Sequence, residues 1–496
     1  MKGFGNKVIK SRLTVKDVVK EKIVKKAQEY YKKGDINSSL QCYESCMEKG
    51  LQDPNMISEY GIILYQTGSQ DKAINIFEQS IINYPKNPDL YANLSNIYKF
   101  KGDLIKAENL IRKSFELNPN STIVLNNFIS ILICRKQFYE AEKYAVLSLK
   151  IDQPNSDTFY NLGIVYSNIH HYQEAITYFK ESIKLDETSY PANLNLGAVL
   201  LKLNRFDESK KYLNISLNLN PQSYEAYFNL GQLYLYTNAL IDSEKCFQKS
   251  LSICKNNDEV YKYLGIVEFM NFNKNSSNSI KKAIELNPSI NISHVLNSVI
   301  KLNNNSEESK AHFHKNPYDN FGEKPIILHR PIQESLITTL YKRNTSNLNK
   351  IDNNPHSGNA IGSDYFLFKD DDPILNALQK DLKDITSEFF NSEIFIEDAF
   401  FRILQGEGQV EKHTHIGIID KLERLNLYKH KFSLVYYLKT GDHDCSEPGY
   451  LTFYNPDDKI LPKPGMIILF PSDRPHSVLY NGKSDRMILS INFYSY

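Results

Sequence analysis

The hydrophobic and polar positions of this chain follow two different patterns, one before and one after a polar stretch near residue 310. From residue 23 to residue 302 the apolar positions recur at helical spacing, and the same residue types return every 34 positions. Three sets of small residues keep this interval: Gly34, Gly68 and Gly102; Ala73, Ala107, Ala141 and Ala175; and Gly163, Gly197, Gly231 and Gly265. This constancy predicts stacked pairs of antiparallel helices, with a last helix at 290–302 closing the array.

After residue 394 the pattern changes to short runs of aromatic and β-branched residues between glycines and prolines, which is typical of strands. The runs predict strands at 394–404, 432–438, 450–454, 466–470 and 486–494. Helical spacing at 373–390, with a proline at the start, predicts a helix that packs its apolar face on a sheet. The fold class expected is therefore α+β multidomain: an all-α repeat superhelix, then a double-layered β barrel or jelly roll with flanking helices.

These patterns divide the chain into four expected parts. They are a basic N-terminal arm at 1–22, helical repeats at 23–302, a polar linker at 303–326 and a β domain at 327–496. The 59 Lys and Arg residues nearly balance the 58 Asp and Glu residues, so there is no general electrostatic reason to expect nucleic acid as a partner. No apolar run is long enough to span a bilayer, and no signal peptide is evident, so we expect a cytoplasmic protein without a membrane partner.

A representative repeat has tyrosine, leucine and glycine on its first helix and small and aromatic residues on its second. Its positions are Tyr160, Leu162, Gly163, Tyr166, Ala175, Phe179 and Ser182. In these residues and their spacing the chain resembles the tetratricopeptide repeat family, with about eight units between residues 23 and 288. The resemblance implies a groove that binds a protein or a peptide.

Five asparagines share one position of successive repeats, two residues before the glycine position. They are Asn93, Asn127, Asn161, Asn195 and Asn229. A side-chain amide offers a donor and an acceptor that match a peptide unit, so this ladder is a candidate binding site for an extended polypeptide. It resembles the asparagine ladder in the repeats of the O-linked N-acetylglucosamine transferase. The alternative is that asparagine is frequent here because it forms hydrogen bonds within the array.

The β domain carries a candidate metal site. His413 and His415 are separated by one residue, and His476 comes from a distant run, which is a spacing typical of non-haem iron ligands. Arg486, ten residues beyond His476, is expected to begin the next strand and to point into the barrel. There its guanidinium can bind a carboxylate in bidentate fashion.

Five segments of the last 100 residues or so are similar, in family order, to the 2-oxoglutarate and Fe(II)-dependent dioxygenases, in particular to the prolyl hydroxylase-like group and to uncharacterised bacterial and phage members with an HxH pattern. The segments are FFRILQGEGQVEKHTH, SLVYYLKTG, GYLTFYNP, LPKPGMIILFPSDRPHSV and RMILSINFY. The resemblance implies a double-stranded β-helix in which His413 and His476 bind iron. It also implies that Arg486 binds the distal carboxylate of 2-oxoglutarate, with Tyr437 and Ser490 assisting.

His415 stands where the family has Asp or Glu, and three interpretations remain open. His415 is the third ligand; a water or a chloride takes its place; or His415 is the first ligand and Gly417 occupies the acid position. Asp420 lies too far along the chain to be a good carboxylate candidate.

The expected function is hydroxylation of a protein or peptide that the repeat groove presents, with Fe(II) as cofactor, 2-oxoglutarate and molecular oxygen as cosubstrates, and ascorbate as a supporting reductant. One alternative is an interaction scaffold whose barrel is inactive. Another is a small-molecule oxygenase in which the repeats only localise the enzyme.

Overall fold

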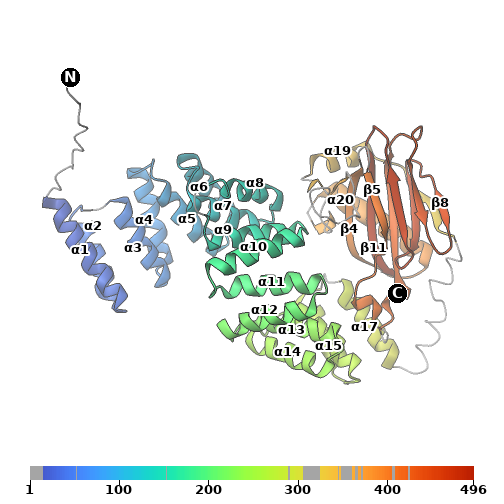
Figure 1. The fold of residues 1–496 in the computed structure, drawn as a ribbon, viewed down its shortest axis with the longest axis horizontal. Helices are drawn as coiled ribbons and strands as arrows, with labels where there is room; N and C mark the ends of the chain where they lie inside the picture. Colours follow the sequence, from blue (N-terminus) through green and yellow to red (C-terminus); the bar gives the residue numbers. More distant parts are fainter. Residues whose placement is uncertain are drawn as a thin grey trace. The chain divides into compact units, whose positions relative to one another are not determined.

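The computed structural model describes residues 15–51, 53–151, 154–288, 291–304, 324–343, 346–347, 360–362, 367–369, 372–404, 408–422 and 425–495. The chain forms two compact units, Met1–Val165 and Tyr166–Tyr496. Figure 1 shows the helices of the repeats and the strands of the β domain. The first unit contains the N-terminal repeats, and the second contains the later repeats together with the β domain. Most of the predicted N-terminal arm and of the predicted linker lies outside the described residues, so these two boundaries stay predictions.

Among the described residues, the repeat region consists of eight helix pairs and a final single helix. The helices are α1 (Val15–Lys32), α2 (Ile36–Glu48), α3 (Pro54–Gln66), α4 (Gln70–Asn83), α5 (Pro88–Lys101), α6 (Leu104–Leu117), α7 (Thr122–Cys134), α8 (Phe138–Ser148), α9 (Ser156–Asn168), α10 (Tyr172–Leu185), α11 (Tyr190–Lys202), α12 (Phe206–Leu219), α13 (Tyr224–Tyr236), α14 (Leu240–Ile253), α15 (Asp258–Met270), α16 (Ser276–Leu286) and α17 (Asn291–Asn304). The helix predicted at 290–302 is therefore present as α17.

The 34-residue interval has a conformational cause at the turn between the two helices of each pair. One residue in every such turn has a positive φ, and these residues are Gly34, Gly68, Gly102, Lys136, His170, Asn204, Asn238 and Phe272. The left-handed conformation closes a helix and lets the chain reverse, and glycine adopts it without strain. Glycine holds the position in the first three pairs, and other residues replace it in the later pairs.

A second glycine position lets the two helices of a pair approach closely. A Cβ atom at Gly231 would lie 2.6 Å from the Phe247 ring, and one at Gly197 would lie 2.7 Å from Cγ of Leu213. Buried serines on the second helix then bond to the facing main chain: the Ser243 hydroxyl donates to the Gly231 carbonyl at 2.7 Å. This bond satisfies a buried hydroxyl group within the repeat.

The β domain consists of two antiparallel sheets. The strands are β1 (Ile326–His329), β2 (Ser346–Asn347), β3 (Ala360–Gly362), β4 (Ile394–Leu404), β5 (Gly408–His413), β6 (Lys431–Thr440), β7 (Pro448–Phe453), β8 (Asp458–Ile460), β9 (Met466–Pro471), β10 (His476–Tyr480) and β11 (Arg486–Ser495). The seven-stranded sheet has the order β1-β9-β6-β11-β4-β3-β2, and the four-stranded sheet has the order β5-β10-β7-β8. The five predicted strands are present as β4, β6, β7, β9 and β11, whereas β5 and β10 were not predicted.

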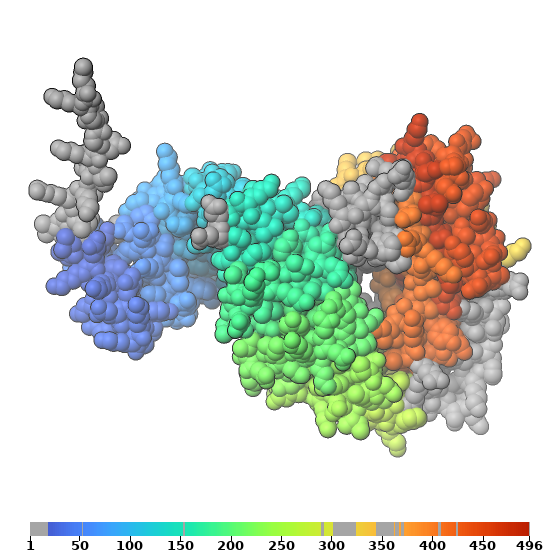
Figure 2. Space-filling model, in the orientation of Figure 1, coloured from blue at the N-terminus to red at the C-terminus, as the bar shows by residue number. Residues whose placement is uncertain are grey.

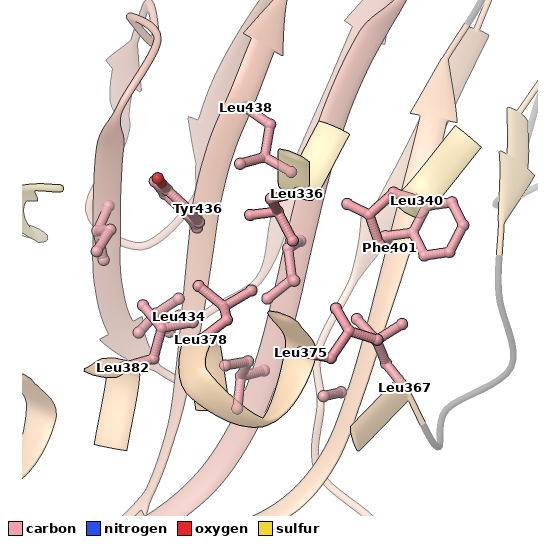
Figure 3. Packing of buried hydrophobic residues seen from close by; sticks show 14 of the residues in the cluster. Leu336, Leu340, Leu367, Leu375, Leu378, Leu382, Phe401, Leu434, Tyr436 and Leu438 are labelled. Carbon is pink, nitrogen blue, oxygen red and sulfur yellow. The ribbon is translucent and has the colours of Figure 1, made fainter. Parts of the chain in front are cut away.

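Helices cover the outer face of the seven-stranded sheet. Helix α20 (Pro373–Phe390) confirms the helix predicted at these residues, and α19 (Glu334–Lys342) lies in the same core. Leu375, Leu378 and Leu382 of α20 are at most 2% exposed and pack with alternate residues of β6, such as Leu434 and Tyr436 (Figure 3). This packing buries a continuous apolar layer.

The inner face of the same sheet packs against the four-stranded sheet. A second apolar cluster joins Val435 of β6 and Ile468 of β9 to Val410 of β5, Leu451 of β7 and Val478 of β10. The two sheets therefore form two layers that face each other across a shared core.

In the second unit, the last repeats and the β domain share a third apolar cluster. It joins Val267 of α15 and Val295 of α17 to Phe395 of β4 and Tyr494 of β11. The ring of His294 also stacks on Phe395, with a centroid distance of 6.2 Å. In Figure 2 these repeats are green to yellow, and the β domain is orange to red.

Candidate metal centre

The three predicted histidines lie together at one end of the four-stranded sheet. His413 is the last residue of β5, His476 is the first residue of β10, and the two stand directly opposite each other in this antiparallel pair. His415 follows β5 by two residues, and its main-chain N–H donates to the Ser472 carbonyl at 2.8 Å. One ring nitrogen from each histidine lies within 4.8 Å of the other two, which is close enough for a shared metal ion.

Hydrogen bonds set the ring tautomers of His413 and His476. Nδ1 of His413 lies 2.8 Å from the Glu411 carbonyl oxygen, and Nδ1 of His476 lies 3.1 Å from that of Arg474. Because a carbonyl oxygen only accepts, both Nδ1 atoms carry the hydrogen, and each Nε2 keeps a lone pair that can bind a metal.

His415 has a different environment. Its Nδ1 lies 3.4 Å from the side-chain nitrogen of Asn492, which also donates to Oδ1 of Asp398 at 2.8 Å. The Asn492 side-chain oxygen accepts from the Ser433 hydroxyl at 2.7 Å. The bonds to Asp398 and to Ser433 therefore both require the same orientation of the Asn492 amide, with its nitrogen toward Asp398 and His415. In this arrangement Nδ1 of His415 accepts and Nε2, which lies 3.2 Å from Nε2 of His476, carries the hydrogen. The role of His415 as a metal ligand therefore stays a prediction.

Burial favours the neutral form of His476 and of His415. It lowers the pKa of His476 to about 3, with a further contribution from His413. It also lowers the pKa of His415 well below its usual value, together with the charges of His476 and His413. The ring of Phe470 packs edge-on against His476 at 4.7 Å and excludes solvent there. Neutral imidazole is the form that binds metal ions, so these side chains fit a transition metal without losing a proton.

Arg486 is a buried cation without a counter-ion among the described residues. It begins β11, is fully buried, and uses only Nη1 for hydrogen bonds, to the carbonyl oxygens of Pro448 and Gly449. Its Nε and Nη2 atoms have no hydrogen-bond partner in the described part of the chain. Burial lowers the pKa of Arg486 because the charged guanidinium is removed from water. Two unpaired donors on a buried guanidinium match a carboxylate ligand.

The other two predicted cosubstrate residues lie on the same inner face. The Tyr437 ring of β6 is 1% exposed and lies 5.2 Å from the centre of the Arg486 guanidinium. Ser490 is four residues after Arg486 on β11, so the two side chains leave the same side of the sheet. Asn492 continues this row, and it contacts His415.

Asp420 is fully engaged elsewhere. One of its oxygens accepts from the Gly417 main-chain N–H at 2.8 Å and from the Lys431 ammonium at 2.7 Å, and the other accepts from the Tyr494 hydroxyl at 2.7 Å. These three bonds give Asp420 a structural role in the loop after the histidines.

The five asparagines lie on α5, α7, α9, α11 and α13, the first helices of successive pairs, and all are partly buried. Two of the side-chain amides donate to main-chain carbonyl oxygens of the array. Asn161 donates to the Asn126 carbonyl at 3.3 Å, and Asn195 donates to the Pro191 carbonyl at 2.9 Å. The side chains of Asn93, Asn127 and Asn229 form no hydrogen bond with a described residue. The array thus uses two of the five amides itself, and the ligand role of the set stays a prediction.

Three residues near the histidines were not predicted: Asp398, Arg402 and Asn492. The Arg402 charge lowers the pKa of His415 and His476 further, and burial raises the pKa of Asp398 to about 7. Asp398 and Arg402 lie at alternate positions of β4 among apolar residues. This pattern could have predicted from the sequence that both side chains lie on one face of the strand.

Comparison with known proteins bears on the repeats. Family models described as tetratricopeptide repeat match residues 76–109, 170–233 and 224–257. The array is built of tetratricopeptide repeats. Proteins with such repeats commonly bind protein or peptide partners. A search of curated proteins found no match.

Solved structures resemble the repeat array at low sequence identity. A chain of the APC/C hetero-tetramer Cut9-Hcn1 is 13% identical with a TM-score of 0.48; the match covers 56% of the present chain and 55% of that chain. A tetratricopeptide repeat protein from Parabacteroides merdae is 16% identical with a TM-score of 0.41; the match covers 50% and 98%. YrrB, described as having an unusual peptide-binding site, is 21% identical with a TM-score of 0.30; the match covers 36% and 91%.

Among the described helices, none has both the length and the apolar character that crossing a bilayer requires.

Proposed function

We propose that the β domain is a double-stranded β-helix that acts as an Fe(II)- and 2-oxoglutarate-dependent dioxygenase on a protein or peptide. Its two facing antiparallel sheets are compatible with this fold. The repeats support an interaction role, and we propose that they bring the substrate to the β domain.

One observation carries the proposal: a buried guanidinium with two unpaired donors lies on the inner face of the seven-stranded sheet, in the same two-sheet domain as a cluster of three histidines. Arg486 is 0% exposed, and His476 is 4% exposed. A buried charge without a counter-ion costs stability, and a ligand of opposite charge would offset that cost. We propose that a dicarboxylate binds Arg486 at one end and reaches the histidines with the other.

The donor set fits iron. Imidazole nitrogen is a normal ligand for iron as well as for zinc, copper and nickel, and His413 and His476 present suitable lone pairs. No described carboxylate joins the cluster, so an anionic cosubstrate would supply the missing negative charge. Bound iron would supply the redox chemistry by which 2-oxoglutarate and oxygen become succinate, carbon dioxide and a hydroxylated C–H bond.

The chain's own residues then have separate tasks. His413 and His476 would hold the metal, with their orientation set by the Glu411 and Arg474 carbonyls. Arg486, with Tyr437 beside it, would orient the cosubstrate. We propose that Ser490 offers a further hydroxyl on the same face.

Turnover without substrate tests the proposal. The purified chain, given Fe(II), ascorbate and 2-oxoglutarate in air, should form succinate slowly, and His476→Ala should reduce this to background. His443, an exposed loop histidine, provides the matched control, because His443→Ala should leave the rate unchanged. A wild-type protein that binds no iron and forms no succinate would overturn the proposal.

The repeats themselves favour a second candidate, an interaction scaffold with an inactive β domain. Metal content separates the two: the scaffold predicts less than stoichiometric iron even after reconstitution, whereas the enzyme predicts one iron per chain. A small-molecule oxygenase would instead bind iron but show no dependence on the repeats.

A further inference from the structure

A pocket lies within the second unit where the later repeats meet the β domain. Its volume is approximately 520 Å³, within the range of roughly 300–1,000 Å³ that is usual for ligand sites. The repeats contribute residues of α11, α13 and α15, and the β domain contributes β4, β11 and the loop after the histidines. We call this hollow the repeat-β pocket; its lining includes Lys202, Asn229, Gln232, Glu397, Gly417 and Tyr494.

Lys202 is the cation of the repeat wall. It ends α11, is exposed to the pocket, and lies 5.7 Å from the centre of the Tyr172 ring. It forms no ion pair with any residue in the described ranges. The surrounding protein lowers the pKa of Lys202 by desolvation. An ammonium in this position gains from a carboxylate partner.

The carboxylates on the opposite wall are already paired. Glu397 lies 2.5 Å and Asp420 lies 2.7 Å from the Lys431 ammonium. The Tyr494 hydroxyl, which has one hydrogen to donate, lies 3.1 Å from a Glu397 oxygen and 2.7 Å from an Asp420 oxygen. The two carboxylates thus share one ammonium, and the Glu397 side chain stays 32% exposed. Lys202 is left as the cationic lining residue available to an incoming ligand.

Asn229 adds a group suited to a peptide main chain. Its side chain lines the pocket and forms no hydrogen bond with a described residue, in contrast to Asn195 one repeat earlier. A free primary amide can donate to the carbonyl and accept from the N–H of one peptide unit. The repeat wall thus combines an amide suited to a peptide main chain, on α13, with a cation one repeat earlier, on α11.

The β wall of the pocket includes the loop that follows the histidines. Gly417 follows His415 by two residues, and Glu397 directly precedes Asp398, whose carboxylate accepts from the Asn492 side chain. A ligand in the pocket would therefore contact the loop that carries the second histidine.

We propose that the repeat-β pocket binds an extended peptide that carries an acidic side chain, with its carboxylate on Lys202 and its main chain on Asn229. That this peptide is the substrate rests on the proposed dioxygenase function; the binding itself does not. The proposal therefore specifies the partner as a peptide segment that has Asp or Glu at one position.

Paired peptides test the proposal without catalysis. An array of immobilised decapeptides would present each sequence twice, identical except for one Glu that is replaced by Gln in the second copy. The wild-type chain should bind the Glu member of responsive pairs roughly fivefold to tenfold better. Lys202→Gln should remove this preference, and Lys202→Glu should reverse it.

The matched control is Lys249→Gln, because Lys249 is exposed on α14 and does not line the pocket. It should keep the preference for Glu. Asn229→Ala should weaken both members of each pair equally. If the wild type shows no preference for Glu, or if Lys202→Gln retains it, the peptide proposal is wrong. Iron content and succinate formation, measured on the same samples, report separately on the dioxygenase function.

Discussion

The two faces of the seven-stranded sheet are built from alternate residues of the same strands. They differ in whether their buried polar groups have hydrogen-bond partners. On β11 the outer residues are Met487, Leu489, Ile491 and Phe493, whereas the inner residues include Arg486, Ser490 and Asn492. The outer arginine, Arg330, pairs with Asp381 at 2.7 Å and donates to the Tyr436 hydroxyl at 3.3 Å. The inner arginine keeps two donors unpaired. The outer face therefore supports the fold, and the inner face is built for a ligand.

Among single substitutions, the largest expected effect on stability comes from the outer face. Leu378→Ala would open a cavity between α20 and the sheet, where Leu378 is 2% exposed. The free energy of unfolding should fall by about 3 kcal/mol, as measured by urea denaturation. Leu479→Ala, at a position 44% exposed on β10, should change it by less than about 0.5 kcal/mol. Equal effects of the two changes would contradict the account of the outer core.

Replacing each buried arginine by methionine should give effects of opposite sign. Arg330→Met removes a paired cation and should lower the free energy of unfolding by about 1–2 kcal/mol. Arg486→Met removes a buried cation that has no counter-ion among the described residues. This change should raise the free energy of unfolding of the ligand-free protein by about 1 kcal/mol. Chemical denaturation of both variants checks this contrast, and a clear loss of stability in Arg486→Met would remove it.

The histidines of the metal centre should make the metal-free protein sensitive to acid. The pKa of His476 is lowered to about 3, whereas an unperturbed histidine has a pKa near 6.5. Between these values the unfolded chain binds more protons, so stability is complete above pH 6.5 and declines toward pH 3. The loss should be roughly 1 kcal/mol per pH unit for this residue.

His476→Gln should make that decline less steep in the presence of a chelator. His443→Gln, in the exposed loop, should not change the slope. Denaturation at a series of pH values measures both variants, and an unchanged slope in His476→Gln would assign the acid sensitivity to other groups.

The smallest effect is expected at Ser490. Its hydroxyl forms no hydrogen bond with a described residue, so Ser490→Ala should change the free energy of unfolding by less than about 0.5 kcal/mol. If the Ser490 hydroxyl forms a hydrogen bond with 2-oxoglutarate, Ser490→Ala should weaken the binding of 2-oxoglutarate by roughly threefold to tenfold, as measured by calorimetry. Unchanged affinity would remove Ser490 from the site.

The sequence was most informative where structure depends on local spacing. The repeats follow from residues 34 positions apart, because each helix pair contacts its neighbours along the chain. The left-handed turn between the two helices of a pair could be predicted only where glycine marks it, as at Gly34 and Gly68. Lys136 and Phe272 adopt the same left-handed conformation in later pairs, and their residue types do not predict it.

The strands of the metal centre were harder to predict. β5 and β10 are short and carry polar residues, so their hydrophobic pattern is weak. Their pairing brings His413 opposite His476, 63 positions later in the chain, and no local pattern encodes such a contact. The resemblance to a known family supplied the residues, but the Asn492 contact with His415 depends on tertiary structure.

The most direct test of the central claim is the affinity of 2-oxoglutarate for the chain with and without a metal ion. Calorimetry with Mn(II), which binds to similar ligands, should show one 2-oxoglutarate per chain, bound at least about tenfold more tightly when the metal is present. Arg486→Met should weaken this binding by roughly 100-fold. Binding that depends on neither the metal nor Arg486, or no binding at all, would contradict the account.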